Sequence, residues 1–356
     1  MAADEDLPSG GQRLDFPHPR TQTSLVGQSE AWSALEASYQ SGRMHHGWLL
    51  TGVAGIGKAT LAYRFAEAIL SHSRFSDNAP NFGDIDQKTQ SLVTQNAHPD
   101  LKAIERRFDT KTKRLRSEIT VDDIRQLGQF FASKPAFGAW RVGIIDAAEE
   151  MNRNAANALL KLLEEPPQRA VIFLVSHVAG RLLPTLKSRV RRLPMTPLDA
   201  DSVRSVVARC LTGEKTRDGA IDSAISVAGG SAGEALEILV QDEKGALSKL
   251  ASLLSDIDQG PDTRLHDAIE AMLRKRDDAI FWRGISLIRD SYADRMRSAA
   301  LLPAPIPVMQ AWSDAWQTLH SHVEDTRTLN LDRKYLMYLS LSRLKDLTIR
   351  SKSQAA

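Results

Sequence analysis

The sequence has a single cysteine, Cys210, and lacks long apolar runs. One thiol excludes an internal disulfide and a zinc site built from several thiolates, and it is typical of a reducing compartment. No stretch of 18 apolar residues is present, so no segment predicts a membrane-spanning helix. The first twenty residues, MAADEDLPSGGQRLDFPHPR, are acidic and polar and differ from a secretion signal. These features predict a cytoplasmic protein without a membrane partner.

An excess of charge of either sign is also lacking. The formal net charge is +2, from 46 basic and 44 acidic residues, so no global field directs the chain to nucleic acid. Any DNA contact must then come from a local patch. A basic turn is the candidate, and it holds Lys111, Lys113, Arg114 and Arg116 together with Arg106 and Arg107. A solvated hairpin tip is the preferred interpretation of this turn, and contact with DNA phosphates is the alternative.

The order of the elements predicts three structured parts. Residues 1–20 carry Gly, Pro, Asp and Glu without periodicity and predict a mobile tail. Over residues 21–196, apolar strands alternate with amphipathic helices, which is typical of an α/β domain with a parallel sheet. Residues 197–245 and 246–356 show helical patterns only. We therefore expect an α/β core followed by two all-helical domains.

Several elements are predicted individually from periodicity and from their flanking residues. Ser29 is expected to cap a helix, Thr120 and Asp123 to form a capping box, and Pro166-Pro167 to end a helix. The expected helices cover residues 29–40, 58–70, 121–133 and 154–165, and the expected strands cover 48–50, 141–146 and 170–176. A loop is expected over residues 71–98, a hairpin between 98 and 120, and a linker over 194–197.

A glycine-rich turn lies between the strand at 48–50 and the following helix. The run from Gly52 to Lys58 fits the first seven positions of the phosphate-loop pattern GxxxxGK[ST], with Gly52, Gly55 and Gly57 as its glycines. Such glycines let backbone N–H groups surround a phosphate at a helix N-terminus, and Lys58 adds a positive charge. The strand before and the helix after supply the context that this motif requires. The pattern predicts a nucleotide-binding site.

Two positions of the predicted site depart from an active ATPase. The eighth position of the loop is Ala59, where a Ser or Thr hydroxyl would bind Mg²⁺, and Thr60 would point about 100° away around the helix. Asp146 ends an apolar strand and could hold a metal-bound water. Ala147 follows it in place of an acid, and Glu149 is expected to lie too far along the chain to replace that acid. The sequence thus predicts nucleotide binding without hydrolysis.

Ser176 ends the strand expected over residues 170–176. It would occupy a polar sensor position beside the nucleotide. A plain serine at the end of a strand is the alternative, because the site that it would sense lacks catalytic groups.

Longer segments carry a resemblance to a known family. HHGWLLTGVAGIGKATLA, NAHPDL, ITVDDIRQL, NAANALLKLLEEPP, AVIFLVS and LPTLKSRVRRLP resemble the delta-prime family of bacterial DNA polymerase III clamp-loader subunits, which are AAA+ proteins. LLKLLEEPP is the most specific of them, and the likeness covers about residues 20–200. The resemblance implies an AAA+ P-loop ATPase-like core over 21–196, a helical lid over 197–245, and a helical collar over 246–356 that joins five subunits in a ring.

The resemblance also implies roles for single residues. Ser188-Arg189-Val190 matches the family's Ser-Arg-Cys motif with Val in place of Cys, which implies that Arg189 is an arginine finger acting in trans at a neighbour's ATP site. The alternative places Arg189 in a surface basic cluster with Lys187, Arg191 and Arg192. Gly233 stands where active members carry a lid arginine. Family members commonly hold a four-cysteine zinc module after the P-loop helix, but residues 71–98 contain no cysteine, so zinc is not expected.

These features together predict a clamp-loader subunit of the DNA polymerase III holoenzyme, a nucleotidyltransferase complex. The chain would act in DNA replication as stator and finger donor while the sliding clamp is loaded onto primed DNA, and it would bind ATP or ADP without hydrolysis. Its expected partners are the motor and clamp-opening subunits of a hetero-pentamer, the sliding clamp, and primer-template DNA reached through the complex. A catalytically active AAA+ motor and a non-hydrolysing nucleotide-sensing module are the alternatives.

Overall fold

The computed structural model describes residues 16–72, 85–109, 114–137, 140–211, 218–242, 245–259, 261–273, 278–301, 306–329 and 331–355. The chain divides into two compact units, one of Met1–Glu214 with Gly229–Glu234 and one of Lys215–Ala228 with Ala235–Ala356. Each unit has its own set of buried apolar side chains. Within the described ranges, no helix has the length and apolar character needed to cross a membrane. The division into core, lid and collar stays a prediction.

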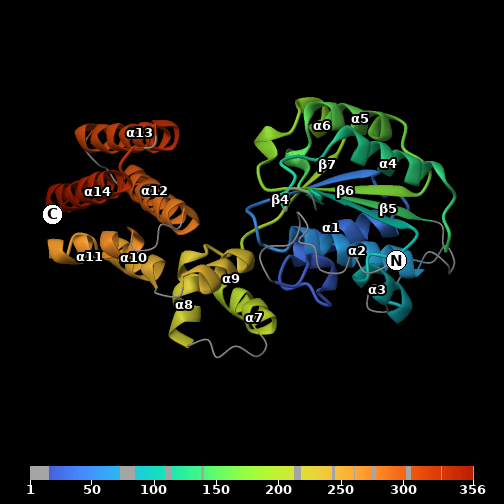
Figure 1. The fold of residues 1–356 in the computed structure, drawn as a ribbon, viewed down its shortest axis with the longest axis horizontal. Coiled ribbons are helices and arrows are strands. Elements are labelled where there is room, and N and C mark those ends of the chain that lie inside the picture. The colour runs from blue at the N-terminus through green and yellow to red at the C-terminus, as the bar shows by residue number, and fades with distance from the viewer. Residues whose placement is uncertain are drawn as a thin grey trace. The chain divides into compact units, whose positions relative to one another are not determined.

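The first unit is built on a parallel sheet of five strands (Figure 1). Every residue of β1, β5 and β6 is buried. Helices cover both faces of the sheet, which is why these strands are continuous apolar runs instead of alternating patterns. The order is β2-β5-β6-β1-β7, with bounds Gly47–Thr51 (β1), Leu101–Glu105 (β2), Arg141–Asp146 (β5), Ala170–Ser176 (β6) and Arg191–Pro194 (β7). The expected α/β core with a parallel sheet between helices is confirmed.

Two buried clusters join the helices to the faces of this sheet. Side chains of α1 (Ser29–Gln40) and α2 (Lys58–His72) pack on one face, and those of α4 (Val121–Ala132) and α5 (Arg153–Glu164) pack on the other (Figure 1). The unit also contains α3 (Gln87–Thr94), α6 (Pro184–Lys187), α7 (Ala200–Cys210) and the 3₁₀ helices η1 (Pro19–Thr21), η2 (Ala148–Glu150) and η3 (Ala179–Arg181).

Local chemistry explains where these helices begin. The Asp123 carboxylate accepts a hydrogen bond from Thr120 N at 2.9 Å, as expected for the capping box of α4. Asn152 caps α5 by accepting from Ala155 N at 2.9 Å. The cap expected at Ser29 is wrong by one residue: Gln28 is the N-cap of α1, with a left-handed φ of 59°, and Ser29 is the first helical residue.

The expected hairpin between residues 98 and 120 is wrong in the pairing of its strands. Leu101–Glu105 joins the main sheet as β2 and pairs with β5. The hairpin is much smaller, with β3 at Phe108–Asp109 and β4 at Arg114–Leu115. Strand pairing is a tertiary property, so an extended run does not reveal which strand it pairs with.

Two elements lie where loops were expected. Within 71–98, α3 begins behind Asp86, whose carboxylate accepts from Lys88 N and Thr89 N and caps the helix. At the start of the expected linker, Pro194 is the last residue of β7, an edge strand that pairs with β1. Proline is tolerated at an edge strand because its missing N–H leaves no central ladder bond unmade.

Residues 1–15 of the expected mobile tail lie outside the described residues. His18, near the end of the expected tail, is instead held by the core. It is buried, its Nε2 lies 3.0 Å from Glu105 Oε1, and its Nδ1 accepts from Arg20 N at 3.1 Å. The tail therefore cannot extend to residue 20.

The second unit is helical throughout its described residues (Figure 1). Tyr292 and Trp312 are buried side by side at the centre of its last three helices, where Tyr292 Oη donates to Ser340 O at 2.8 Å and Trp312 Nε1 donates to Ser351 Oγ at 3.0 Å. The helices are α8 (Asp218–Val227), most of α9 (Ala232–Gln241), α10 (Ala246–Ser255), α11 (Asp262–Leu273), α12 (Asp278–Leu301), α13 (Ile306–Leu329) and α14 (Arg333–Ala355). The expected all-helical region after the α/β core is confirmed.

Candidate functional site

The phosphate loop connects the carboxyl end of β1 to the first residue of α2, as the motif requires. Gly52, Gly55 and Gly57 all have positive φ values, of 150°, 77° and 97°. A Cβ at Gly52 would lie 2.7 Å from the carbonyl oxygen of Met195, so this position also excludes a side chain by contact. The loop therefore has the backbone that its glycines predict.

Lys58 is buried, and its ammonium bonds to the loop itself. Its Nζ donates to Gly52 O at 2.8 Å and also to Val53 O. The positive charge thus lies among the carbonyls of the loop that it was expected to serve. A phosphate at this loop would have to replace these carbonyls as partners of the ammonium.

The two residues after Lys58 lie at the start of α2 in different surroundings. Ala59 is buried within the apolar cluster on that face of the sheet, and Thr60 is only half-buried. A methyl group at Ala59 offers no oxygen to a metal ion. The structure thus gives no reason for Thr60 to replace the missing hydroxyl.

Polar residues end four neighbouring strands at the carboxyl edge of the sheet. Thr51 of β1 is in register with Ser176 of β6, and Glu105 of β2 is in register with Asp146 of β5. The carboxyl ends of parallel strands, next to the loop after β1, are where α/β sheets bind ligands. The fold therefore gathers Lys58, Asp146 and Ser176 at one edge.

Asp146 is buried at this edge. Burial raises the pKa of Asp146 to about 8, and the negative charge of Glu105 adds to this effect, while Lys58 partly offsets it. At neutral pH the carboxyl is therefore mostly protonated. A protonated carboxyl is a poor metal ligand, because metal binding requires the carboxylate.

This burial predicts a pH-dependent stability. Between about pH 4 and 8 the folded chain keeps the Asp146 proton that the unfolded chain releases, so the free energy of unfolding should fall as pH rises, by up to about 1.4 kcal/mol per unit. Asp146→Asn should remove this contribution. Urea unfolding across that window should show that the free energy of unfolding of the variant increases relative to that of the native chain as pH rises. Parallel curves for the two proteins would contradict the prediction, and the exposed Asp122→Asn is the control.

Ser176 is fully buried at the end of β6, and its Oγ has no hydrogen-bond partner among the described residues. Buried hydroxyls are normally hydrogen-bonded, so this one requires an explanation. A polar sensor hydroxyl facing a ligand is compatible with this geometry.

Glu149 has a contact that sequence reasoning missed. It lies in η2, and its Oε1 accepts hydrogen bonds from His177 N at 2.7 Å and from Val178 N at 3.1 Å, directly after β6. Its carboxylate thus joins the chain after β5 to the chain after β6. The spacing of Asp146 and Glu149 gave no signal for this contact, because its partners are main-chain groups.

The segment Gly229–Glu234 belongs to the first unit and contacts the loop. Ser231 Oγ donates to Ala54 O at 2.7 Å, and Gly233 N donates to Gly55 O at 3.0 Å. A Cβ at Gly55 would lie 2.3 Å from Ser231 Oγ. Gly233, at the position of the family's lid arginine, thus lies against the loop but provides only a main-chain N–H.

Arg189 lies between α6 and β7, distant in the chain from the phosphate loop. Its Nη2 lies 2.8 Å from Glu164 Oε1, and its Nη1 donates to Thr185 O at 3.1 Å. Two other members of the basic cluster have different contacts: Arg191 lies over the Trp48 ring, and Arg192 Nε donates to Thr51 Oγ1. Arg189 therefore has different contact residues from the two arginines of β7.

The basic turn is engaged by acidic residues of its own unit. Arg106 Nε lies 2.6 Å from Glu150 Oε2, and Arg107 Nε lies 3.0 Å from Asp123 Oδ1. Lys111 and Lys113 lie outside the described residues. The described part of the turn thus has two of its charges paired within the protein.

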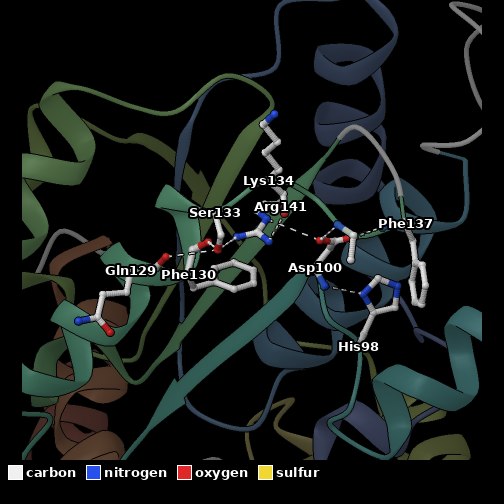
Figure 2. A network of polar contacts seen from close by, with 9 residues as sticks. His98, Asp100, Gln129, Phe130, Ser133, Lys134, Phe137 and Arg141 are labelled. Atoms are coloured by element: carbon white, nitrogen blue, oxygen red, sulfur yellow. Dashed lines mark hydrogen bonds and ion pairs between the residues drawn. The ribbon is translucent and has the colours of Figure 1, made fainter.

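A second polar network lies at the amino ends of β2 and β5 (Figure 2). Asp100 is buried, and its two carboxylate oxygens accept from Ala136 N at 2.7 Å and Phe137 N at 2.8 Å. Arg141 Nε lies 3.6 Å from Asp100 Oδ1, and the Arg141 guanidinium donates to Ser133 Oγ and Lys134 O. Asp100 N donates to His98 Nδ1 at 3.1 Å. The NAHPDL motif therefore holds the chain between α4 and β5 at the edge opposite the phosphate loop.

Comparison with known proteins agrees with this arrangement. A model of the family "DNA polymerase III, delta subunit" matches residues 27–199. The DNA polymerase III subunit delta' of Pseudomonas aeruginosa is 34% identical over 204 residues, which cover 57% of this chain and 58% of the relative. Subunit tau of Escherichia coli is 27% identical over 291 residues, which cover 80% of this chain and 42% of the relative. The chain thus spans about half the length of the curated relatives it matches.

Among solved structures, a DNA polymerase III gamma subunit-related protein of Thermotoga maritima is 19% identical, covering 89% of this chain and 99% of that one, with a TM-score of 0.37. A likeness at that level assigns no residues. The family match instead covers the phosphate loop, Asp146, Ser176 and Arg189. Residues 27–199, just under half of this chain, therefore match the DNA polymerase III delta-subunit family.

Proposed function

We propose that this chain is a clamp-loader subunit that acts in DNA replication as stator and arginine-finger donor. The observation that carries the proposal is a contrast within one unit. The chain's own nucleotide edge lacks a hydroxyl at Ala59, an acid at Ala147 and a guanidinium at Gly233. Arg189, in contrast, is partly exposed and is held by residues that belong to no nucleotide site. Such a chain would assist hydrolysis at another subunit and not at its own loop.

The chemistry of phosphoryl transfer supports this assignment. Hydrolysis of ATP needs a metal ion on the phosphates and a residue that orients the attacking water. Ala59 cannot bind the metal ion through its side chain, and the raised pKa of Asp146 weakens the remaining carboxyl as a ligand. Glu149 Oε1 accepts from His177 N and Val178 N, which holds this carboxylate against the chain after β6 and not in the place of the acid lost at Ala147. Bound ATP or ADP would therefore stay unhydrolysed at Gly52, Gly55, Gly57 and Lys58.

The proposed partners follow from the family. They are the motor and clamp-opening subunits of a hetero-pentamer, the sliding clamp, and primer-template DNA reached through the complex. Apolar side chains are exposed near the end of α13 and on α14, namely Leu329, Leu331, Tyr335 and Tyr338. Exposed tyrosines with apolar neighbours are common at protein interfaces. They support a collar role for the last helices, in a cytoplasmic complex without structural zinc.

The isolated chain should release no phosphate from ATP, with or without primed DNA, because the metal-binding and water-orienting groups are missing. A phosphate-release assay on the pure protein tests this, with Lys58→Ala as the control for contaminating ATPases. Turnover that Lys58→Ala abolishes would establish the alternative, a catalytically active motor subunit. A chain that binds ATP but joins no other clamp-loader subunit would instead establish the nucleotide-sensing module.

A further inference from the structure

The side chain of Arg189 is held by contacts from two elements. Nη2 forms its ion pair with Glu164 Oε1 at the last residue of α5. Nη1 donates to Thr185 O of α6 at 3.1 Å and to Ser188 Oγ at 3.3 Å. A carboxylate from α5 and a carbonyl from α6 thus fix the plane of the guanidinium.

The backbone beneath this contact is also fixed. A Cβ at Gly47, the first residue of β1, would lie 2.9 Å from Leu163 Cδ2 and 3.0 Å from Val190 Cγ1. The residues next to Glu164 and next to Arg189 therefore meet at the start of a buried strand. Leu163 is buried, and Val190 packs against the same apolar cluster. The ion pair thus joins two main-chain positions that the core already holds.

The N–H donors of the guanidinium that remain free of these contacts are suited to binding a phosphate. An arginine has five N–H donors, and the contacts with Glu164, Thr185 and Ser188 use three of them. The side chain is 37% exposed and that of Glu164 is 49% exposed, so the remaining donors can be reached from outside the chain. A pair this exposed contributes little to folding. Its effect is therefore to be sought in the orientation of Arg189.

We infer that Glu164 is a positioning residue for Arg189, presenting the guanidinium to the phosphate groups of a nucleotide bound by a neighbouring subunit. The inference rests on the proposed finger role. A finger contributes most when its geometry is set before the reaction, because ordering a long side chain in the transition state costs entropy. Glu165, the next residue, forms no ion pair with Arg189 in the described part of the chain and provides a matched comparison.

Steady-state ATP hydrolysis by the complex assembled with full-length subunits tests the inference. Glu164→Ala should lower kcat by about two- to fivefold with KM for ATP unchanged, which is the factor expected from losing one exposed ion pair. Glu164→Gln keeps an acceptor oxygen and should recover part of the loss. Glu165→Ala should match the native complex. All three variants should assemble normally.

A second readout uses the isolated chain and does not depend on the finger role. Nitrogen NMR of the Arg189 guanidinium reports rotation about its Nε–Cζ bond, which should be faster in Glu164→Ala and unchanged in Glu165→Ala. Unchanged rotation in Glu164→Ala would overturn the positioning role alone. So would a kcat that does not fall in the Glu164→Ala complex while the Arg189→Ala complex is impaired. An unimpaired Arg189→Ala complex would overturn the finger role, and the positioning inference with it.

Discussion

Arg189→Ala is expected to lower ATP hydrolysis and clamp loading by the assembled complex while leaving folding and assembly intact. A guanidinium is always charged and can form paired hydrogen bonds to phosphate oxygens as charge develops in the transition state. Fingers supplied in trans contribute about 10³–10⁵ in rate at their own site. In a ring with several ATP sites, the total rate of ATP hydrolysis should fall by the fraction that the site served by Arg189 contributes. Phosphate release and clamp loading on primed DNA are the measurements.

The controls come from the same segment. Arg189→Lys should rescue poorly, because an ammonium cannot reproduce the fork of the guanidinium. Lys187→Ala removes a charge from the same surface cluster and should leave the rate unchanged. Full clamp-loading activity in an assembled Arg189→Ala complex would return Arg189 to the surface cluster and refute the finger role.

Asp100→Ala should destabilise the first unit by about 3–5 kcal/mol, because it leaves the buried charge of Arg141 without its partner. It also removes the acceptor of two short hydrogen bonds, from Ala136 N and Phe137 N (Figure 2). Arg141 would keep Ser133 Oγ and Lys134 O as neutral acceptors. Urea unfolding monitored by circular dichroism measures the change in the free energy of unfolding.

A double variant separates the charge effect from the lost hydrogen bonds. Asp100→Ala combined with Arg141→Met should cost less than the sum of the two single variants, because no unpaired charge is then buried. Asp122→Ala, which removes an exposed ion pair with Arg125, should change stability by less than about 1 kcal/mol. Additive effects of Asp100 and Arg141 would show that the two side chains do not act as a pair.

Local chemistry was enough to predict much of the first unit. The run from Arg141 to Asp146 and the run from Ala170 to Ser176 are strands with the expected bounds, because a strand buried on both faces is apolar between its ends. The phosphate loop was predictable because its glycines and Lys58 lie next to one another in the chain. The capping box at Thr120 and Asp123 is local as well.

Other contacts depend on residues that are distant in the chain. The roles of Glu149 and Asp100 could not be predicted, because each carboxylate accepts from main-chain N–H groups, which every residue except proline carries. The partners of Lys58 lie close to it in the chain, but they too are main-chain groups, carbonyls of its own loop, so residue type did not reveal them.

Sequence alone determined the phosphate loop, its missing hydroxyl at Ala59, the buried strands and the family resemblance. Tertiary structure alone decided that Gly233 N donates a hydrogen bond to Gly55 O, that Glu164 forms an ion pair with Arg189, and that Leu101–Glu105 joins the main sheet. The physical reason is the range of the interactions. Periodicity, caps and glycine conformations depend on neighbours within a few residues. The pairing of strands and carboxylates depends on how the whole chain folds back on itself, which a local pattern does not encode.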